Sequence, residues 1–280
     1  MKRMSSWRRG MFRRWKRLRQ SLGKRENSKR ITFIVGCQRS GTTMLSRVFE
    51  KDLRSISFGE DSELTIESGP NRLRLKPLEW VEDRIRSERP GFIILKPLVE
   101  SQNTRLLLDY FTGSKSIWIY RDFRDVAASN LRKFGDKNSI KDIRIIAENQ
   151  TDDWRVEKLS DKSKALVRHY FTPDISPADA AVLFWIFRNE LYFEIGLDHD
   201  DRVALLQYEA LESDPERLMR AIYCFIDQPF PSKRITADTH AQSINRGREL
   251  SISPDIEKLA ISLNERLDTL WQQRLAGFVS

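Results

Sequence analysis

The segment FIVGCQRSGTTMLSRVF (33–49) joins a strand pattern to a helix pattern through a loop that runs from Gly36 to Gly41. The spacing G-x-x-x-x-G is typical of loops whose backbone N–H groups wrap a phosphate, while the N-terminus of the following helix adds its partial positive charge. We therefore expect an anion to bind where this strand ends. The candidate binding residues are Arg39, Ser40, Gly41, Thr42 and Thr43.

The position of the cation separates this loop from those of nucleoside triphosphatases. Those loops carry a Lys directly after the second glycine, where it reaches β- and γ-phosphates, and Thr42 stands at that place here. Nor is there a clear apolar strand ending in a magnesium-binding Asp. A P-loop kinase or NTPase remains an alternative, but the loop argues against it. Cys37 lies within the loop, so we expect a thiol reagent to block binding.

A second group of polar residues follows the strand pattern SIWIY (116–120). Arg121 stands at the carboxyl end of that strand, where open α/β sheets bind their ligands. If a helix starts near Arg124, Ser129 and Lys133 share the helix face that turns back toward the same crevice. Arg121, Ser129 and Lys133 could then hold a second phosphate, although the segment taken alone also fits a solvated, well-capped helix.

Taken together, the two segments resemble the sulfotransferases that use 3′-phosphoadenosine 5′-phosphosulfate (PAPS). CQRSGTT (37–43) is similar to the family's 5′-phosphosulfate loop, and YRDFRDVAAS-x-x-x-K (120–133) to its 3′-phosphate element. Three further segments fall in the family's order, and the resemblance covers roughly residues 31–250. These segments are SFGEDSEL (57–64), similar to the Gly-Glu-acid segment of the tyrosylprotein branch, ILKPL (94–98), and LLQYEALESDPERL (205–218) with its Tyr-Glu pair.

The resemblance implies roles for individual residues in sulfuryl transfer from PAPS to an acceptor hydroxyl, without a metal. Glu60 would be the base that takes the acceptor's proton, and we expect the site to bury it in part. Arg39 and Lys96 would stabilise the charge that develops during transfer. The implied donor-binding residues are Arg39, Ser40, Gly41, Thr42 and Thr43 at the 5′-phosphate, Arg121, Ser129 and Lys133 at the 3′-phosphate, and Tyr208 and Ser243 at the nucleotide.

Two features depart from other branches of this family. The cytosolic small-molecule enzymes carry Lys in the loop and a catalytic His, whereas this chain has Arg39 and no His before His169. No recognisable peptide-binding element follows Glu60, which argues against a tyrosine side chain of a protein as the acceptor. We expect a glycan, lipid-linked or peptide acceptor, and four aromatic residues could line its pocket. These are Trp80, Phe134, Trp154 and Trp185.

Strand and helix patterns alternate along the chain, which predicts an α/β fold with a central parallel sheet covered on both faces. The resemblance implies the three-layer α/β/α architecture of P-loop-like sulfotransferases. Residues 31–280 would form this domain, and the charged stretch 136–175 could be a lid or a substrate-facing insertion. The expected strands are 31–36, 91–96, 116–120 and 202–207, and the expected helices 42–52, 102–111, 124–134, 177–196, 214–226 and 254–275.

The net charge of +9 is concentrated in residues 1–30, which hold 13 Lys or Arg and one acid, so the other 250 residues carry −3. An apolar stripe runs through this basic tail at helical spacing. Such a helix suits an anionic membrane surface, contacted through residues 1–25. A nucleic-acid contact (which we do not expect), a targeting peptide and a solvated leader are alternatives. The stripe consists of Trp7, Met11, Trp15, Leu18 and Leu22.

Composition excludes some classes of site. Three His and two Cys, far apart in the sequence, build no zinc finger, redox pair or disulfide framework. The low cysteine content and the lack of a secretory signal predict a cytoplasmic protein, with the tail as a peripheral membrane contact. A non-enzymatic module that uses the tail to bind a membrane or nucleic acid is the remaining alternative.

Overall fold

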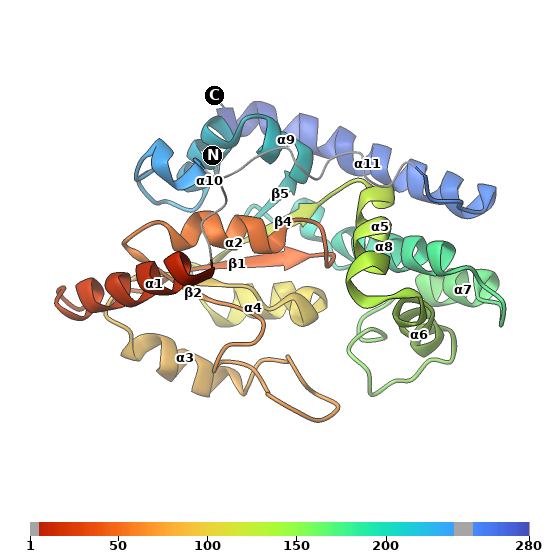
Figure 1. The fold of residues 1–280 in the computed structure, drawn as a ribbon, viewed down its shortest axis with the longest axis horizontal. Coiled ribbons are helices and arrows are strands. Elements are labelled where there is room, and N and C mark those ends of the chain that lie inside the picture. The colour runs from red at the N-terminus through yellow and green to blue at the C-terminus, as the bar shows by residue number, and fades with distance from the viewer. Residues whose placement is uncertain (1–5, 238–248, 280) are drawn as a thin grey trace.

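A computed structural model describes residues 6–237 and 249–279 of the chain. Its centre is a sheet of five parallel strands in the order β2-β3-β1-β4-β5 (Figure 1). The predicted parallel sheet is confirmed, and it contains one strand, β2, that the sequence patterns did not indicate. The strands are β1 Arg30–Gly36, β2 Ser55–Phe58, β3 Phe92–Leu95, β4 Lys115–Tyr120 and β5 Val203–Gln207.

Strand β1 occupies the middle of the sheet because both of its faces are apolar. Every residue of β1 after Arg30 is buried. Phe33 lies opposite Leu95 of β3, and Ile34 lies opposite Ile117 of β4. A strand covered on both faces is a continuous apolar run rather than an alternating one, which is why ITFIVG was recognisable in the sequence.

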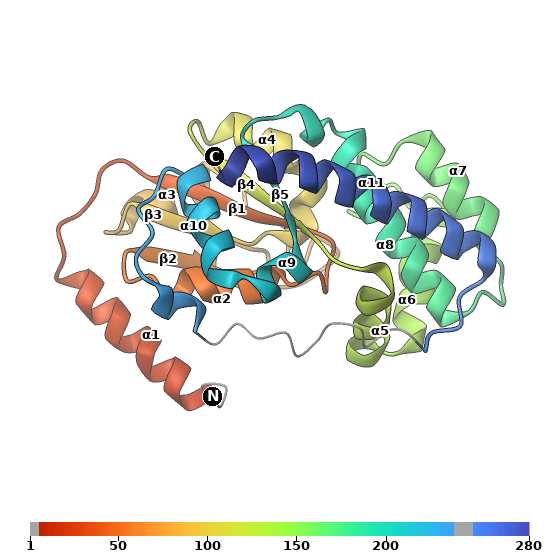
Figure 2. The same ribbon diagram turned by 90° about the horizontal axis from the view of Figure 1, so that it is seen from above.

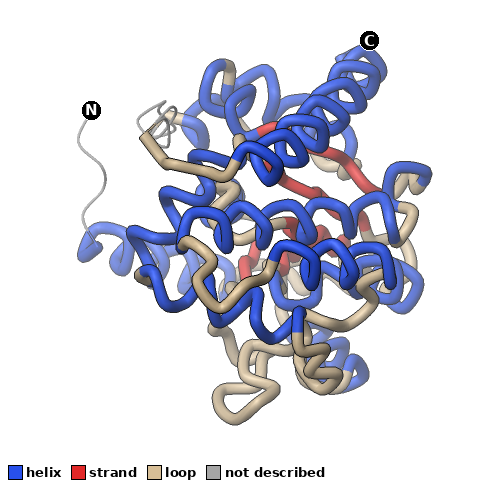
Figure 3. Tube along the Cα trace, turned by 90° about the vertical axis from the view of Figure 1, so that its right-hand side faces the viewer, coloured by secondary structure: helices blue, strands red, loops and turns tan. Residues whose placement is uncertain are grey.

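Helices cover both faces of this sheet, and the three-layer α/β/α arrangement is thereby confirmed. The helices are α1 Ser6–Ser21, α2 Thr42–Glu50, α3 Leu78–Ser87, α4 Thr104–Tyr110, α5 Phe123–Phe134, α6 Asp136–Ala147, α7 Asp161–Tyr170, α8 Pro177–Glu194, α9 Tyr208–Ser213, α10 Pro215–Phe225 and α11 Pro254–Val279, with 3-10 turns η1 Leu98–Asn103, η2 Leu197–His199 and η3 Lys233–Thr236. Figures 1 and 2 show α2 on one face and α4 on the other, and Figure 3 shows the strands enclosed between helices.

The helices α5, α6, α7 and α8 gather beyond the carboxyl ends of the strands (Figure 1). The predicted insertion, residues 136–175, contains α6 and α7. Ile143 and Ile146 of α6 are fully buried in the core, and α6 packs against α8. This segment is therefore part of the packed domain at the edge of the sheet where the site is expected. Its role as a lid stays a prediction.

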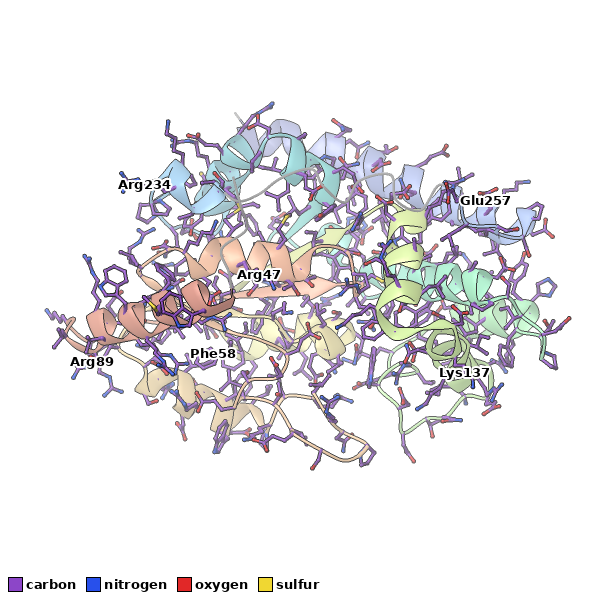
Figure 4. All side chains as sticks on the ribbon, viewed as in Figure 1. Arg47, Phe58, Arg89, Lys137, Arg234 and Glu257 are labelled. Atoms are coloured by element: carbon purple, nitrogen blue, oxygen red, sulfur yellow. The ribbon has the colours of Figure 1, made fainter. Side chains whose placement is uncertain are left out.

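Charged side chains lie on the outer surfaces of α2, α6 and η3. Figure 4 shows the side chains, among them Arg47, Lys137 and Arg234, and all three are exposed to solvent. Among the described residues, no helix is both long enough and apolar enough to cross a lipid bilayer.

Candidate functional site

The loop after β1 is shaped by two glycines with positive φ angles. At Gly36 (φ 123°), an added Cβ would lie 2.4 Å from the carbonyl oxygen of Ile119. At Gly41 (φ 96°), it would lie 2.1 Å from Cδ2 of Tyr208. Only glycine fits either position without displacing its neighbours. The loop therefore turns tightly between two strand ends and delivers the chain to the N-terminus of α2, the arrangement that anion-binding loops require.

Arg39 connects this loop to α5. Its φ angle of 70° is left-handed, an uncommon conformation for a residue with a side chain. Its Nε donates a hydrogen bond to Oγ of Ser129, 3.0 Å away. Burial lowers the pKa of Arg39, and the nearby cations Arg121 and Arg132 lower it further. The two predicted phosphate elements thus meet at a place where positive charges crowd one another, and an anion would relieve that repulsion.

Arg121 is buried at the carboxyl end of β4, where several neighbours hold it. Its guanidinium carbon lies 4.4 Å from the centre of the Tyr208 ring, and its Nη2 lies 2.9 Å from Oδ2 of Asp125. Trp185 donates its indole N–H to the backbone oxygen of Arg121 at 2.9 Å. The Tyr208 hydroxyl bonds to Glu212. Arg121, Tyr208 and Gly41 therefore form one cluster, held in place from several sides.

Lys96, Glu60 and Thr43 form a second cluster on the other side of the loop. The Nζ atom of Lys96 lies 2.5 Å from Oε1 of Glu60 and 3.1 Å from Oγ1 of Thr43. The side chain of Lys96 is 10% exposed and that of Glu60 is 30% exposed. A carboxylate and a cation in direct contact next to the candidate anion-binding loop can accept a proton and stabilise developing charge at one place.

A cavity of about 360 Å³ opens beside these clusters. Gly36 and Gln38 of the loop line it together with Glu60, and the predicted aromatic residues Phe134 and Trp154 also contribute. The other two aromatic candidates lie elsewhere. Trp185 is buried and donates a hydrogen bond to the backbone oxygen of Arg121. Trp80 is an exposed residue of α3 beside Lys76.

Three arginines of this cavity were missed in the sequence. Arg72 comes from the segment between β2 and α3, Arg155 from the loop between α6 and α7, and Arg188 from α8. Arg188 is fully buried, and burial lowers its pKa to about 10. No local pattern marks these positions because each comes from a different segment, and only the fold brings the three side chains together.

Burial raises the pKa of two side chains of the site, the Glu209 carboxyl and the Cys37 thiol. Burial raises the pKa of Glu209 to about 7, although its Oε1 accepts a hydrogen bond from the backbone N–H of Asp122 at 3.1 Å. Burial also raises the pKa of the Cys37 thiol to about 12. Cys37 has no exposed surface, and this burial argues against the expectation that a thiol reagent blocks the loop of the folded protein.

The remaining candidates are placed less decisively. Ser40 and Thr42 are buried within the loop and at the start of α2. Lys133 is an exposed residue of α5, and in residues 6–237 and 249–279 no hydrogen bond or ion pair joins it to the other candidates. Ser243 lies outside the described residues. Within the described part of the chain, no three His, Cys, Asp or Glu side chains are grouped as metal ligands would be.

The family model of the sulfotransferase domain matches residues 29–260. The chain belongs to the sulfotransferase family. This match spans β1 to β5 and every described candidate residue of the site. Among curated proteins, no relative matches this sulfotransferase.

Solved structures agree with this assignment at the level of the fold. The sulfotransferase from Alicyclobacillus acidocaldarius is 16% identical, with a TM-score of 0.52 over 90% of this chain and 100% of that chain. The sulfotransferase STF9 from Mycobacterium avium is 17% identical, with a TM-score of 0.51 over 87% of this chain and 77% of that chain. The sulfotransferase domain from the curacin biosynthetic pathway is 14% identical, with a TM-score of 0.50 over 85% of this chain and 99% of that chain.

Proposed function

We propose that this sulfotransferase transfers a sulfuryl group from PAPS to the hydroxyl group of an acceptor. The observation that carries the proposal is the 3.0 Å hydrogen bond between Arg39 and Ser129, which joins the loop after β1 to the helix after β4. PAPS carries a phosphate on each side of one nucleoside. A donor of this kind accounts for two cationic elements in one crevice, whereas a ligand with a single phosphate group accounts for only one.

In this proposal the chain's own groups divide the donor between them. Ser40, Gly41 and the start of α2 hold the 5′-phosphate through backbone N–H groups and hydroxyls. Arg121, Ser129 and Lys133 hold the 3′-phosphate, which the crowding of Arg39 and Arg121 supports. Tyr208, stacked on Arg121, orients the nucleoside.

Glu60 is proposed as the base and Lys96 as the cation of the transfer step. The acceptor oxygen forms a bond to sulfur, the bond from sulfur to the 5′-phosphate oxygen breaks, and the acceptor's proton moves to Glu60. Lys96 contacts both Glu60 and Thr43, so it is within reach of the side on which the phosphate leaves. Arg39 stabilises the same developing charge from the opposite side of the loop.

The acceptor is proposed to enter the cavity of about 360 Å³ beside Glu60. The aromatic residues Phe134 and Trp154 lie in this lining together with polar groups such as Asn138. This combination suits a sugar ring, which is apolar on its faces and polar at its rim, so among glycan, lipid-linked and peptide acceptors the lining favours a glycan.

The proposed compartment is a reducing cytoplasm, which the two free cysteines, Cys37 and Cys224, support.

Calorimetry with 3′-phosphoadenosine 5′-phosphate (PAP) tests the donor. We expect PAP to bind without metal, and Arg121→Ala to weaken that binding about a hundredfold, because a charge-assisted contact to phosphate is lost in a buried site. The matched control is Arg124→Ala. Arg124 belongs to the same segment, but it pairs with Glu257 of α11, so its loss should leave PAP binding unchanged.

Because Arg121 is buried, thermal unfolding must first show that Arg121→Ala folds. The exposed variant Lys133→Ala provides a second test, with a smaller expected loss. Metal-free PAP binding that decreases in both variants supports the donor site. Binding of ATP with magnesium in place of PAP would overturn the proposal and favour a kinase or NTPase.

A further inference from the structure

Helix α1 presents its apolar stripe to solvent rather than to the core. The stripe is between 48% and 82% exposed; it consists of Trp7, Met11, Trp15 and Leu18 of α1 and Leu22, which directly follows the helix. An amphipathic helix at the surface of a globular protein normally turns this face inward. In α1 the orientation is reversed, which leaves a row of large apolar side chains on the surface of the folded protein. Such a row marks an interaction site more often than an accident of packing.

The opposite face of α1 is attached to the body of the protein through polar contacts. The Nζ atom of Lys16 donates to the backbone oxygen of Glu50 at 2.6 Å and to Oγ of Ser55 at 3.1 Å. The Gln20 amide donates to the backbone oxygens of Leu53 and Ser55, both at 2.8 Å. Burial of Lys16 lowers its pKa to about 8. A buried amine with two acceptors is a specific attachment and orients the helix against α2 and β2.

The attachment fixes the direction in which the apolar stripe points. Lys16 and Gln20 lie on one side of the helix, together with Arg13, which pairs with Glu50. At 100° per residue, the stripe lies on the other side. Arg14 and Arg17 are exposed between these two faces, so positive charges border the apolar row.

We propose that this outward face of α1 docks onto an anionic lipid bilayer and holds the sulfotransferase domain in a fixed orientation on it. Hydrocarbon would cover Trp15 and Leu18, and the bordering arginines would contact anionic headgroups. The 13 Lys or Arg among residues 1–30 complement the negative charge of these headgroups. The polar contacts of Lys16 and Gln20 remain made, so docking needs no unfolding of α1.

Charge also decides between this occupant and others. A second copy packed on the same face would bring two segments of charge +12 together, a repulsion that the bilayer replaces by attraction. Nucleic acid would use the arginines, but it offers no hydrocarbon to cover Met11, Leu18 and Leu22.

Vesicle sedimentation of the full chain tests the proposal. The vesicles are phosphatidylcholine alone or phosphatidylcholine mixed with phosphatidylserine. We expect binding to the mixed vesicles, decreasing with salt, and at least about tenfold weaker partitioning for Leu18→Glu, because a carboxylate replaces an inserted side chain. The matched control is Leu106→Glu, which alters an exposed leucine of α4 and should leave partitioning unchanged.

Several results would overturn this proposal. These are equal partitioning of Leu18→Glu and wild type, equal binding to both kinds of vesicle, a concentration-dependent dimer in the absence of vesicles that Leu18→Glu abolishes, and tight binding of single-stranded RNA that competes with vesicles. PAP binding by Leu18→Glu keeps this test separate from the proposed donor site. We expect it to equal that of wild type, because Leu18 lies outside the site whatever ligand the site binds.

Discussion

The crevice at the strand ends and helix α1 are both rich in cations, but they use them in opposite ways. In the crevice, Arg121 is buried and Arg39 is half-buried, and Ser129, Tyr208 and other side chains from separate elements hold them. On α1, Arg14 and Arg17 are exposed beside an apolar row. The crevice therefore presents charges at fixed points, whereas the helix presents a diffuse positive border.

The difference shows that positive charge alone does not identify a ligand. A small anion with two phosphates needs cations whose positions are fixed, because each contact must form at one distance. An anionic membrane surface needs only that the cations lie near it. Its electrostatic attraction for them does not depend on the rotamer of one side chain. Two carboxylates beside these cations also have defined partners: Glu60 contacts Lys96, and Glu209 accepts a hydrogen bond from the backbone N–H of Asp122.

Removal of the proposed base should have the greatest effect on the crevice. Glu60→Gln keeps the shape of the side chain but cannot take a proton, so we expect turnover to fall by about 10²–10⁴ with PAP affinity little changed. The measurement is sulfate transfer from PAPS to an acceptor mixture, alongside PAP calorimetry. Asp61→Asn, at the exposed neighbouring acid, is the control and should retain activity. Full activity of Glu60→Gln would remove Glu60 from the mechanism.

The geometry of the loop gives a second, sharper test. Gly41→Ala combines a positive φ with a Cβ 2.1 Å from the Tyr208 ring, which Arg121 and Glu212 hold in place. We expect about 2–3 kcal/mol of lost stability and at least tenfold weaker PAP binding. In Gly113→Ala the φ angle is also positive (78°), but nothing lies within 4 Å, so it should cost only about 1 kcal/mol and leave binding intact. Equal effects of the two variants in urea unfolding would show that the Tyr208 contact is unimportant.

The affinity for the donor should also depend weakly on pH. The pKa of Glu209 is raised to about 7 by burial, so the carboxyl is largely neutral below this pH and negative above it. Its Oε1 lies 4.0 Å from Nε of Arg121, where a negative charge opposes a bound phosphate. We expect the PAP affinity of wild type, relative to Glu209→Gln, to fall by about threefold as the pH rises from about 6 to about 8. Glu216→Gln, at an exposed acid of α10, serves as the control and should follow wild type. A constant ratio between wild type and Glu209→Gln would mean that Glu209 does not act on the anion.

Much of the fold was predictable because β1, β3, β4 and β5 are continuous apolar runs. Strand β2 was missed because Ser55–Phe58 is only four residues long and contains two serines. Helices α6 and α7 were missed because their charged residues mask the buried side, where Ile143 and Val167 pack into the core. Short or strongly charged elements gain their stability from tertiary packing, so the local pattern underestimates them.

The candidate site was predictable where its residues lie within one short segment. Gly36 and Gly41 flank one turn, and Arg121 and Ser129 belong to one strand-helix unit, so local geometry fixes their relative positions. The arginines of the cavity come from separate segments and left no local signal. Cys37 was misjudged because its position in the loop does not reveal its burial.

Residue types and their spacing were enough to predict the parallel α/β sheet, the two candidate anion-binding elements and the apolar stripe in the tail. The packed fold was needed to show that Arg39 contacts Ser129, that Lys96 contacts Glu60, and that α1 turns its stripe outward. The two kinds of information act over different distances along the chain. Backbone preferences and side-chain periodicity act over a few residues, whereas each of these contacts depends on how distant elements pack. For α1 the pattern fixed which residues share a face, and hydrogen bonds from Lys16 and Gln20 fixed where that face points.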